Sequence, residues 1–274
     1  MNVEEIQKVI QEKIFGVWTP NHDSSGHRYQ HKNGKNLKSV TTKLGILHKP
    51  HLAKWQIRVA IEWLNVEDRW KRLQNEHWKD EMMTGAMLAP FDIRDEAGGI
   101  GTIAHNAAER YINEWIATKE QPTDMQSFAI ENPDPRSVAS MRAIEAFFTK
   151  HHIIPIASEL LVGDLRYSSG TLDFLAMMDG KLTLIDFKTS NGVDQISYSA
   201  QVAAYKYFFE GMTGLTIKKC KILHLSKDYD KFTVYDVTNL PKAWKAFKQI
   251  CGVYDFMYDG KDNKIIKDIK RISI

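Results

Sequence analysis

The sequence predicts an α/β domain with a central mixed sheet flanked by helices, plus an N-terminal helical and hairpin elaboration. A β-hairpin is the first observation behind this prediction, because the apolar runs 171–178 and 181–189 flank Asp179-Gly180, a typical two-residue turn. The second is the helical spacing of apolar residues over 102–117. The third is composition, since 274 residues with 43% hydrophobic and 26% charged side chains suit one large globular domain or a domain with a sizeable appendage.

The N-terminal part combines basic charge with a hairpin signal. Residues 24–58 carry eight Lys or Arg and no Asp or Glu, which would suit contact with phosphate or a plain solubilising surface. Asn33-Gly34 predicts a turn between strands at 27–31 and 37–41. A helical stretch at 51–82 follows. It bears four tryptophans near one face, for which core packing is expected before base stacking: Trp55, Trp63, Trp70 and Trp78.

The remaining elements follow in order. The helix over 102–117 is expected to begin at Thr102 as its cap, directly after a glycine-rich segment. After the hairpin we expect a helix at 195–211, a strand pair at 219–226 and 231–237, and a closing helix at 240–258. We therefore divide the chain into an N-terminal helical and basic hairpin elaboration (1–98), a core (99–259) and a charged C-terminal tail (260–274).

Three charged residues in the hairpin carry the chemistry. Asp186 and Lys188 are two apart on a strand, so both side chains leave the same face. Counting back from the turn places Asp173 opposite Asp186. Two carboxylates that close repel each other, and a bridging divalent cation such as Mg²⁺ removes the conflict. The alternative is an Asp–Lys salt bridge on a solvated face.

Four motifs follow one another in order: G-T-I-A-H at 101–105, G-T-L-D-F at 170–174, I-D-F-K-T at 185–189 and Q-V-A-A-Y at 201–205. They resemble the PD-(D/E)XK nuclease superfamily, and within it the RecB-like group. The layout before them, a basic hairpin, a Ser-Val-Thr step and a Leu-x-x-Trp helix, also resembles RecB-like exonucleases without an iron–sulfur cluster from phages and mitochondrial genome maintenance. The resemblance implies a restriction-endonuclease-like core. It also implies that one or two Mg²⁺ or Mn²⁺ ions are bound by His105, Asp173, Asp186 and the Phe187 carbonyl.

The resemblance further assigns roles in catalysis. Asp173, Asp186 and Lys188 would be catalytic, with Lys188 orienting the attacking water and stabilising charge on the phosphate. Glu159 would reach the metal or its water, unless it is an ordinary edge-strand glutamate. For His105 the alternative is a hydrogen-bonded core histidine. Glu109 follows one turn later on the same side of the helix, and it either supports the metal ligands or is an exposed acid.

Residues that would contact the nucleic acid lie in two places. Gln201 and Tyr205 share a helix face that would look into the cleft, although Tyr205 can also pack against the sheet. Thr189 and Ser190 precede that helix and could hold a phosphate, or simply form a turn. The basic hairpin would add phosphate contacts from four residues: Arg28, Lys32, Lys35 and Lys38.

These features predict a metal-dependent DNA exonuclease that acts on single-stranded or free ends in recombination, repair or phage DNA metabolism. A structure-specific or restriction-like endonuclease and a non-catalytic nucleic-acid-binding protein are the alternatives. A recombinase or single-strand-binding protein is a possible partner. Two cysteines are too few for a disulfide framework or a four-cysteine iron–sulfur cluster, so we expect no cluster and a reducing compartment, either a bacterial or phage-infected cytoplasm or a mitochondrion. No secretory signal or membrane span is expected.

Overall fold

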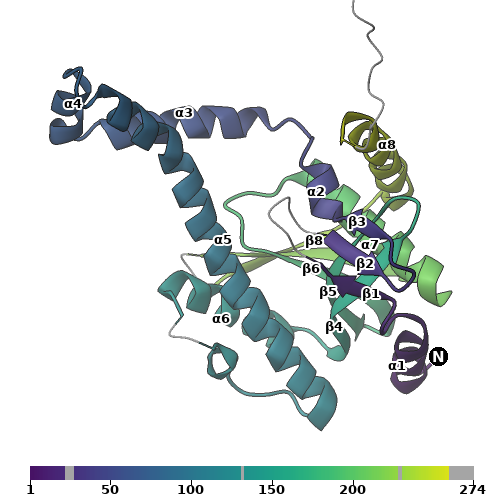
Figure 1. The fold of residues 1–274 in the computed structure, drawn as a ribbon. Coiled ribbons are helices and arrows are strands. Elements are labelled where there is room, and N and C mark those ends of the chain that lie inside the picture. Colours follow the sequence, from purple (N-terminus) through teal and green to yellow (C-terminus); the bar gives the residue numbers. More distant parts are fainter. Residues whose placement is uncertain (22–27, 131–132, 228–229, 259–274) are drawn as a thin grey trace, which may run out of the picture.

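A computed structural model of the chain describes residues 1–21, 28–130, 133–227 and 230–258. Its centre is a five-stranded mixed sheet with helices on both faces, which confirms the predicted α/β class (Figure 1). The strands lie side by side in chain order: β4 (Ile153–Asp164), β5 (Ser168–Met178), β6 (Lys181–Lys188), β7 (Lys219–Leu225) and β8 (Phe232–Asp236). Only β6 and β7 pair in parallel.

The β5–β6 hairpin has the predicted register. Met178 pairs with Lys181, and the ladder continues to Phe174 and Ile185. Asp179 and Gly180 have φ values of 51° and 70°, as the favoured two-residue hairpin turn requires. After β6, helix α7 (Gln195–Thr213) carries the chain back to β7, and this crossover makes the β6–β7 pair parallel.

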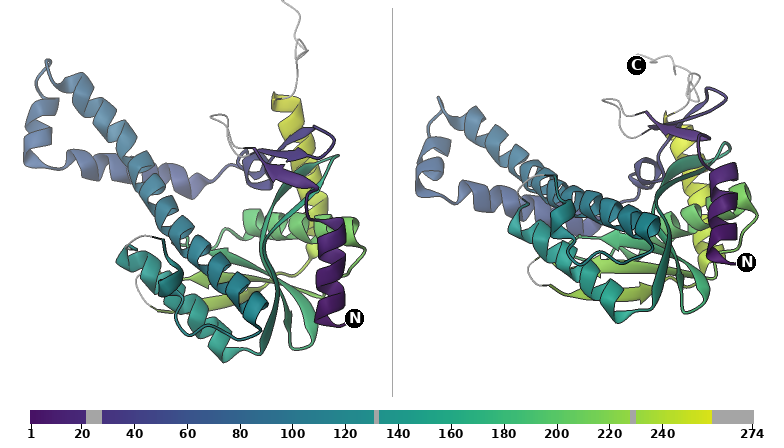
Figure 2. Two further views of the ribbon diagram at one scale, coloured as in Figure 1. Left: turned by 60° about the horizontal axis from the view of Figure 1, so that its bottom comes forward. Right: turned by 90° about the horizontal axis from the view of Figure 1, so that it is seen from below.

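Helices cover both faces of the sheet (Figure 2), and each face has its own hydrophobic core. On one face α7 and α8 (Leu240–Tyr258) pack through side chains such as Phe208 and Phe247. On the other, α5 (Lys79–Thr118) and α6 (Pro135–Lys150) pack through Tyr111 and Phe148, and the short η1 (Gln126–Phe128) lies beside them. Helix α1 (Val3–Lys13) also contributes Ile6 and Ile10 to the first core. Helix α1 is therefore part of the packed structure.

A small second sheet precedes the core. It contains β1 (Trp18–Pro20), β2 (Arg28–His31) and β3 (Asn36–Lys38), in that order and all antiparallel. The predicted Asn33-Gly34 turn is present, and Gly34 has the φ of 88° that favours glycine. The strand expected at 37–41 is shorter, because β3 ends at Lys38. Ser39 accepts a hydrogen bond from the Thr42 N–H and starts helix α2 (Val40–Leu44).

The expected long helix at 51–82 is wrong. The chain instead forms α3 (Pro50–Leu64), α4 (Glu67–Leu73) and the first turn of α5, which together project from the core as an arm (Figure 1). Within the arm α3 packs against α5, and the Trp63 ring lies so close to Gly85 that an added Cβ there would stand 2.3 Å from the ring. Trp70 and Trp78 are 53% and 38% exposed, so core packing is wrong for these two.

Helix α5 is one continuous helix of 40 residues. Its expected start at Thr102 is wrong, since the Thr102 hydroxyl donates to the Gly98 carbonyl within the helix. Each glycine inside a helix costs about 1 kcal/mol, and burial of neighbours such as Ile100 and Ala104 offsets that cost. The expected boundary between residues 98 and 99 thus falls inside α5, while the expected tail at 260–274 lies outside the described residues.

Two further expectations concern the chain as a whole. Both cysteines, Cys220 and Cys251, are buried in the first core as free thiols. Among the described helices none combines the length and the apolar character needed to cross a bilayer.

Candidate metal centre

Three donor side chains from three separate elements meet near the point where the β5–β6 ladder ends. His105 comes from α5, Glu159 from β4 and Asp173 from β5. One ligand atom from each lies within 4.8 Å of the other two. Two carboxylates and an imidazole at such distances are donors that a divalent cation accepts.

Asp173 is held by the backbone of the neighbouring strand. The β5–β6 ladder ends at the Phe174–Ile185 pair, and beyond it Asp173 Oδ2 accepts a hydrogen bond of 2.7 Å from the Phe187 N–H. Asp173 is only 8% exposed. Burial raises its pKa, although Lys188 and the Phe187 N–H act in the opposite direction. Phe187 therefore belongs to the site through its N–H, and its expected role as a carbonyl ligand stays a prediction.

Glu159 occupies a strained backbone position. Its φ is +48°, in the left-handed region that a non-glycine residue adopts at a cost of about 1–3 kcal/mol. The residues on either side keep the sheet register, as Ser158 pairs with Phe174 and Leu160 with Leu172. Burial, followed by repulsion from Asp173, raises the pKa of Glu159 to about 9. The strain thus holds a carboxyl group where it is unfavourable to ionise without a cation.

His105 faces Asp173 and the edge of the Phe187 ring. Its Nδ1 lies 3.9 Å from Asp173 Oδ2, and the two ring centroids are 5.8 Å apart. Burial and the positive charge of Lys188 lower the pKa of His105 to about 4. The imidazole is therefore neutral at neutral pH, which is the form that binds a metal ion.

Asp186 and Lys188 form an ion pair beside these donors. Lys188 Nζ lies 2.6 Å from Asp186 Oδ2, as expected for two side chains on one face of β6. Neither Asp186 oxygen receives a well-directed hydrogen bond from the described residues, although the side chain is fully buried. Burial raises the pKa of Asp186 to about 6. For Lys188, burial favours the neutral amine, but Asp186 and Asp173 outweigh it and raise the pKa.

The charge balance of this group fits a divalent cation. Three carboxyl groups, on the partly buried Glu159 and on the buried Asp173 and Asp186, lie near a single ammonium group on Lys188. The pKa of each carboxyl is raised, so all three are destabilised as anions in the metal-free protein. Oxygen-rich sites with one imidazole suit Mg²⁺ or Mn²⁺ better than softer metals. Asp186 lies outside the three-donor group and contacts Lys188, so its expected role as a ligand stays a prediction.

Helix α7 presents the two predicted residues together. The Gln201 amide donates to the Tyr205 hydroxyl at 3.1 Å, and both side chains are buried. Tyr205 packs against Gly170, where an added Cβ would stand 2.8 Å from its ring. Burial raises the pKa of Tyr205 well above its ordinary value, followed by the charges of Asp186 and Asp173. Tyr205 thus combines sheet packing with proximity to the acids.

Two tyrosines near the site were missed by the sequence reasoning. Tyr29 of β2 hydrogen-bonds through its hydroxyl to Thr171 at 3.0 Å, and its pKa is raised by burial and by nearby Glu159. The Tyr198 ring lies 5.2 Å from Lys188 Nζ, and its hydroxyl donates to Ser190. The spacing of Gln201 and Tyr205 points to one face of α7. Tyr198 is on the same helix, one turn before Gln201, and this spacing is the sequence signal from which its place near the site could be predicted.

The other predicted substrate residues are not part of the three-donor group. Thr189 lies against α5, since its hydroxyl oxygen is 2.6 Å from where a Cβ on Gly101 would stand. On the hairpin, Arg28 pairs with Lys38 across the strands, Lys35 donates to the Leu165 carbonyl at 2.9 Å, and Lys32 is exposed. Their contact with phosphate stays a prediction.

Comparison with known proteins gives little. No family model and no curated protein matches the chain. Among solved structures, one described as "Crystal structure of SSO0001" is 11% identical in sequence and has a TM-score of 0.29. The match covers 58% of this chain and 74% of the chain of that structure. That score is too low to support an argument about function.

Proposed function

We propose that the chain is a metal-dependent deoxyribonuclease of the PD-(D/E)XK superfamily, in the RecB-like group, which hydrolyses phosphodiester bonds in DNA. The observation that carries the proposal is the meeting of His105, Glu159 and Asp173 within 4.8 Å, next to the buried Asp186–Lys188 ion pair. Such a site needs a cation, and its lysine provides a positive charge for an anionic substrate.

The strand arrangement supports a restriction-endonuclease-like core. Asp173 stands on β5, and Asp186 and Lys188 stand on the β6 strand of the same hairpin. The crossover through α7 then adds β7 in parallel and places Gln201 and Tyr205 beside the acids. The motifs at 170–174, 185–189 and 201–205 imply such an arrangement, which supports the proposal.

The residues divide the chemistry between them. His105, Glu159 and Asp173 would hold the ion, with Asp186 adjacent. A bound divalent cation supplies positive charge at the phosphate and lowers the pKa of bound water. Lys188 has its own contribution, because its ammonium group is fixed between Asp186 and the Tyr198 ring and stays protonated. There it can stabilise charge on the phosphate oxygens and orient the attacking water.

An exonuclease that acts on single-stranded or free DNA ends is the more specific proposal. The arm of α3, α4 and the first part of α5 projects from the core (Figure 1), and α5 carries His105 further along, so one continuous helix connects the arm to the site. A strand that enters beside the arm would be guided toward the acids, and the basic hairpin would contact its phosphates.

End-labelled linear and circular DNA, single- and double-stranded, would test the proposal with Mg²⁺, Mn²⁺ or EDTA. We expect metal-dependent loss of linear single strands and survival of circles. Cleavage of circles would instead indicate the endonuclease. Binding without cleavage by the wild type, in either metal, would indicate the non-catalytic alternative. Asp173→Asn should remove activity, while Asp95→Asn, at an exposed position of α5, serves as the matched control.

A further inference from the structure

One face of helix α5 connects the arm with the metal centre. Because an α-helix has 3.6 residues per turn, the residues roughly two, three, four and five turns before His105 return to its side of the helix. They are Gly98, Arg94, Phe91 and Met87, and Met83 lies about one turn further out. We call this set of residues, from Met83 to Gly98, the α5 strip.

The apolar members of the α5 strip are exposed. Met83, Met87 and Phe91 are 48%, 68% and 42% exposed. The adjoining face of the helix is buried, as Met82 and Ala86 are, and α3 packs against α5 there. Contiguous apolar side chains that remain in water beside a packed face are typical of a binding surface.

The charges of α5 are distributed unequally around the helix. Arg94 is the charged residue of the strip, and its guanidinium carbon lies 5.1 Å from the centre of the Phe91 ring. Three acids of the same segment lie on other sides of the helix: Asp92, Asp95 and Glu96. Arg94 pairs with Asp95 at 2.8 Å, but both side chains are exposed and such a pair contributes little. The strip itself is therefore apolar with one positive charge.

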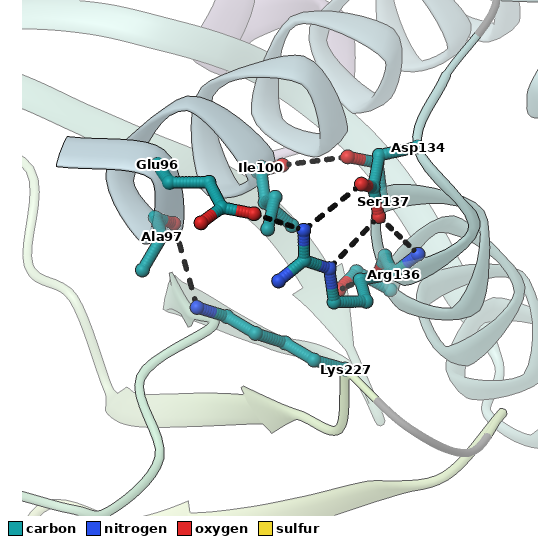
Figure 3. Close-up of polar contacts among 8 residues, drawn as sticks. Glu96, Ala97, Ile100, Asp134, Arg136, Ser137 and Lys227 are labelled. Atoms are coloured by element: carbon teal, nitrogen blue, oxygen red, sulfur yellow. Dashed lines mark hydrogen bonds and ion pairs between the residues drawn. The ribbon is translucent and has the colours of Figure 1, made fainter. Parts of the chain in front are cut away.

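Contacts with α6 fix the rotation of α5 about its axis. Figure 3 shows Glu96 directed at Arg136, 2.5 Å away, and the Ser137 hydroxyl donates to the Ile100 carbonyl at 3.1 Å. Arg136 is held in turn by Asp134, the N-cap residue of α6. Because these contacts engage the other sides of α5, the strip keeps its orientation where it approaches His105.

Two glycines next to the metal centre are not required by the packing of the described residues. A Cβ at Gly98 or Gly99 would have no neighbour within 4 Å, whereas one at Gly101 would stand 2.6 Å from the Thr189 hydroxyl oxygen. Glycine weakens a helix interior, but it lets a ligand approach the backbone closely. Gly98 belongs to the strip, and Gly99 is about 100° further round the helix, which makes it the natural control.

We propose that the α5 strip binds single-stranded DNA on its way to the metal centre, with unpaired bases against Phe91 and Met87 and the strand passing over Gly98. This rests on the proposed nuclease function and specifies which strands the site accepts. Bases stack on exposed aromatic side chains whatever their sequence. In a duplex the faces of the bases are covered by their neighbours, so the strip selects single strands.

Two observations favour a DNA strand over a protein as the occupant. The strip leads to His105, and Gly98 is only about 10 Å from it along the helix, so a chain on the strip reaches the metal centre. The charge of the strip is also complementary to a polyanion, because Arg94 can contact a phosphate while the bases lie on the apolar side chains.

Strands with and without bases test the proposal. A thymidine oligonucleotide and an abasic strand of equal length would be titrated with Mg²⁺ into protein that carries Asp173→Asn and so leaves them intact. Adding Phe91→Ala should weaken binding of the thymidine strand about 5- to 100-fold, as expected for one lost stacking contact, and leave the abasic strand unchanged. Leu88→Ala, at an exposed apolar position on another side of α5, is the matched control. Equal losses for both strands, or no loss, would overturn the proposal.

The two glycines provide a second test. Gly98→Leu and Gly99→Leu should both be accommodated, because both positions are open. We expect Gly98→Leu to raise the KM for single-stranded DNA about tenfold or more by displacing the strand, and Gly99→Leu to leave it unchanged. Equal KM values in the two variants would overturn the path over Gly98.

These measurements separate the strip from the nuclease activity. Base-dependent binding that is lost in Phe91→Ala supports the strip even if no DNA is cleaved. Normal KM and kcat for single strands in Phe91→Ala would keep the nuclease and remove the strip. Sedimentation of the wild type and Phe91→Ala tests a second copy as the occupant. A dimer that dissociates in the variant, with unchanged strand binding, would overturn the proposal in favour of that copy.

Discussion

Oδ2 of Asp173 accepts a hydrogen bond from the Phe187 N–H at 2.7 Å, at the point where the β5–β6 ladder ends. The side chain of one strand thus replaces the next backbone contact between the strands. This bond fixes the Asp173 carboxylate relative to β6, on which Asp186 and Lys188 stand. The same oxygen lies 3.9 Å from His105 Nδ1, and the predictions below depend on this arrangement.

Removing the lysine should destabilise the metal-free protein. Lys188→Met leaves Asp186 buried without its counter-charge, and breaking one side of a buried pair costs about 3–5 kcal/mol. Adding Asp186→Asn removes the unpaired charge, so the double variant should recover much of the free energy of unfolding. Denaturant titration with EDTA measures both. Equal stability of the single and double variants would contradict the ion pair. Both variants should lack DNA cleavage, because both lack Lys188.

Stability of the metal-free protein should fall with rising pH. The folded pKa of Glu159 is about 9 against an ordinary 4.5, so the folded chain keeps a proton that the unfolded chain has released. Below pH 6.5 the lowered pKa of His105 acts in the opposite direction, because its unfolded imidazole binds a proton that the folded one does not. The effect of Glu159 is therefore separated from that of His105 between pH 6.5, the ordinary pKa of histidine, and about pH 9.

Melting temperatures measured across that window in EDTA would check this. Glu159→Gln cannot ionise and should flatten the decline, whereas Glu114→Gln, at an exposed position of α5, should not. Mg²⁺ should raise the melting temperature most at the alkaline end, because the carboxylates it binds are then least stable without it. A decline that persists unchanged in Glu159→Gln would assign the effect to another group.

Metal affinity should depend on all three donors. Replacing His105 by Ala or Glu159 by Gln removes one ligand atom from the group. We expect the affinity for Mn²⁺, measured by calorimetry, to fall by at least about 10–100-fold. That is the loss typical for residues that contact a metal ligand without binding the metal themselves. Glu109→Gln provides a comparison, since Glu109 raises the pKa of Glu159 but is not in the donor group. Its effect should be smaller than that of either donor.

The Tyr198 ring should position Lys188. Tyr198→Phe keeps the ring 5.2 Å from the ammonium group and loses only the bond to Ser190, whereas Tyr198→Ala loses both. A cation–π contact at a partly desolvated site is worth about 1–2 kcal/mol, so kcat should fall about 5- to 30-fold in the alanine variant. The phenylalanine variant should stay near the wild type. Its pH–rate profile should also match, while that of the alanine variant shifts at the alkaline limb.

The sequence by itself determined the hairpin and its chemistry. The Asp179-Gly180 turn fixes the register between the strands, and a two-residue period then puts Asp186 and Lys188 on one face. Local turn chemistry and alternation are sufficient for this, since both act over a few residues. The closing helix at 240–258 followed equally from its own apolar pattern, and the structure has it at those bounds.

Only the tertiary structure decided which carboxylates meet. Glu159 joins His105 and Asp173 because β4 adopts a left-handed backbone there, a strain that no local pattern announces. Helix α5 likewise runs through Gly98, Gly99 and Gly101, where sequence favours a break, because packing of its buried residues against α3 and the sheet outweighs the cost of the glycines. Contacts between residues distant in the chain set these features, and they lie beyond any window of sequence.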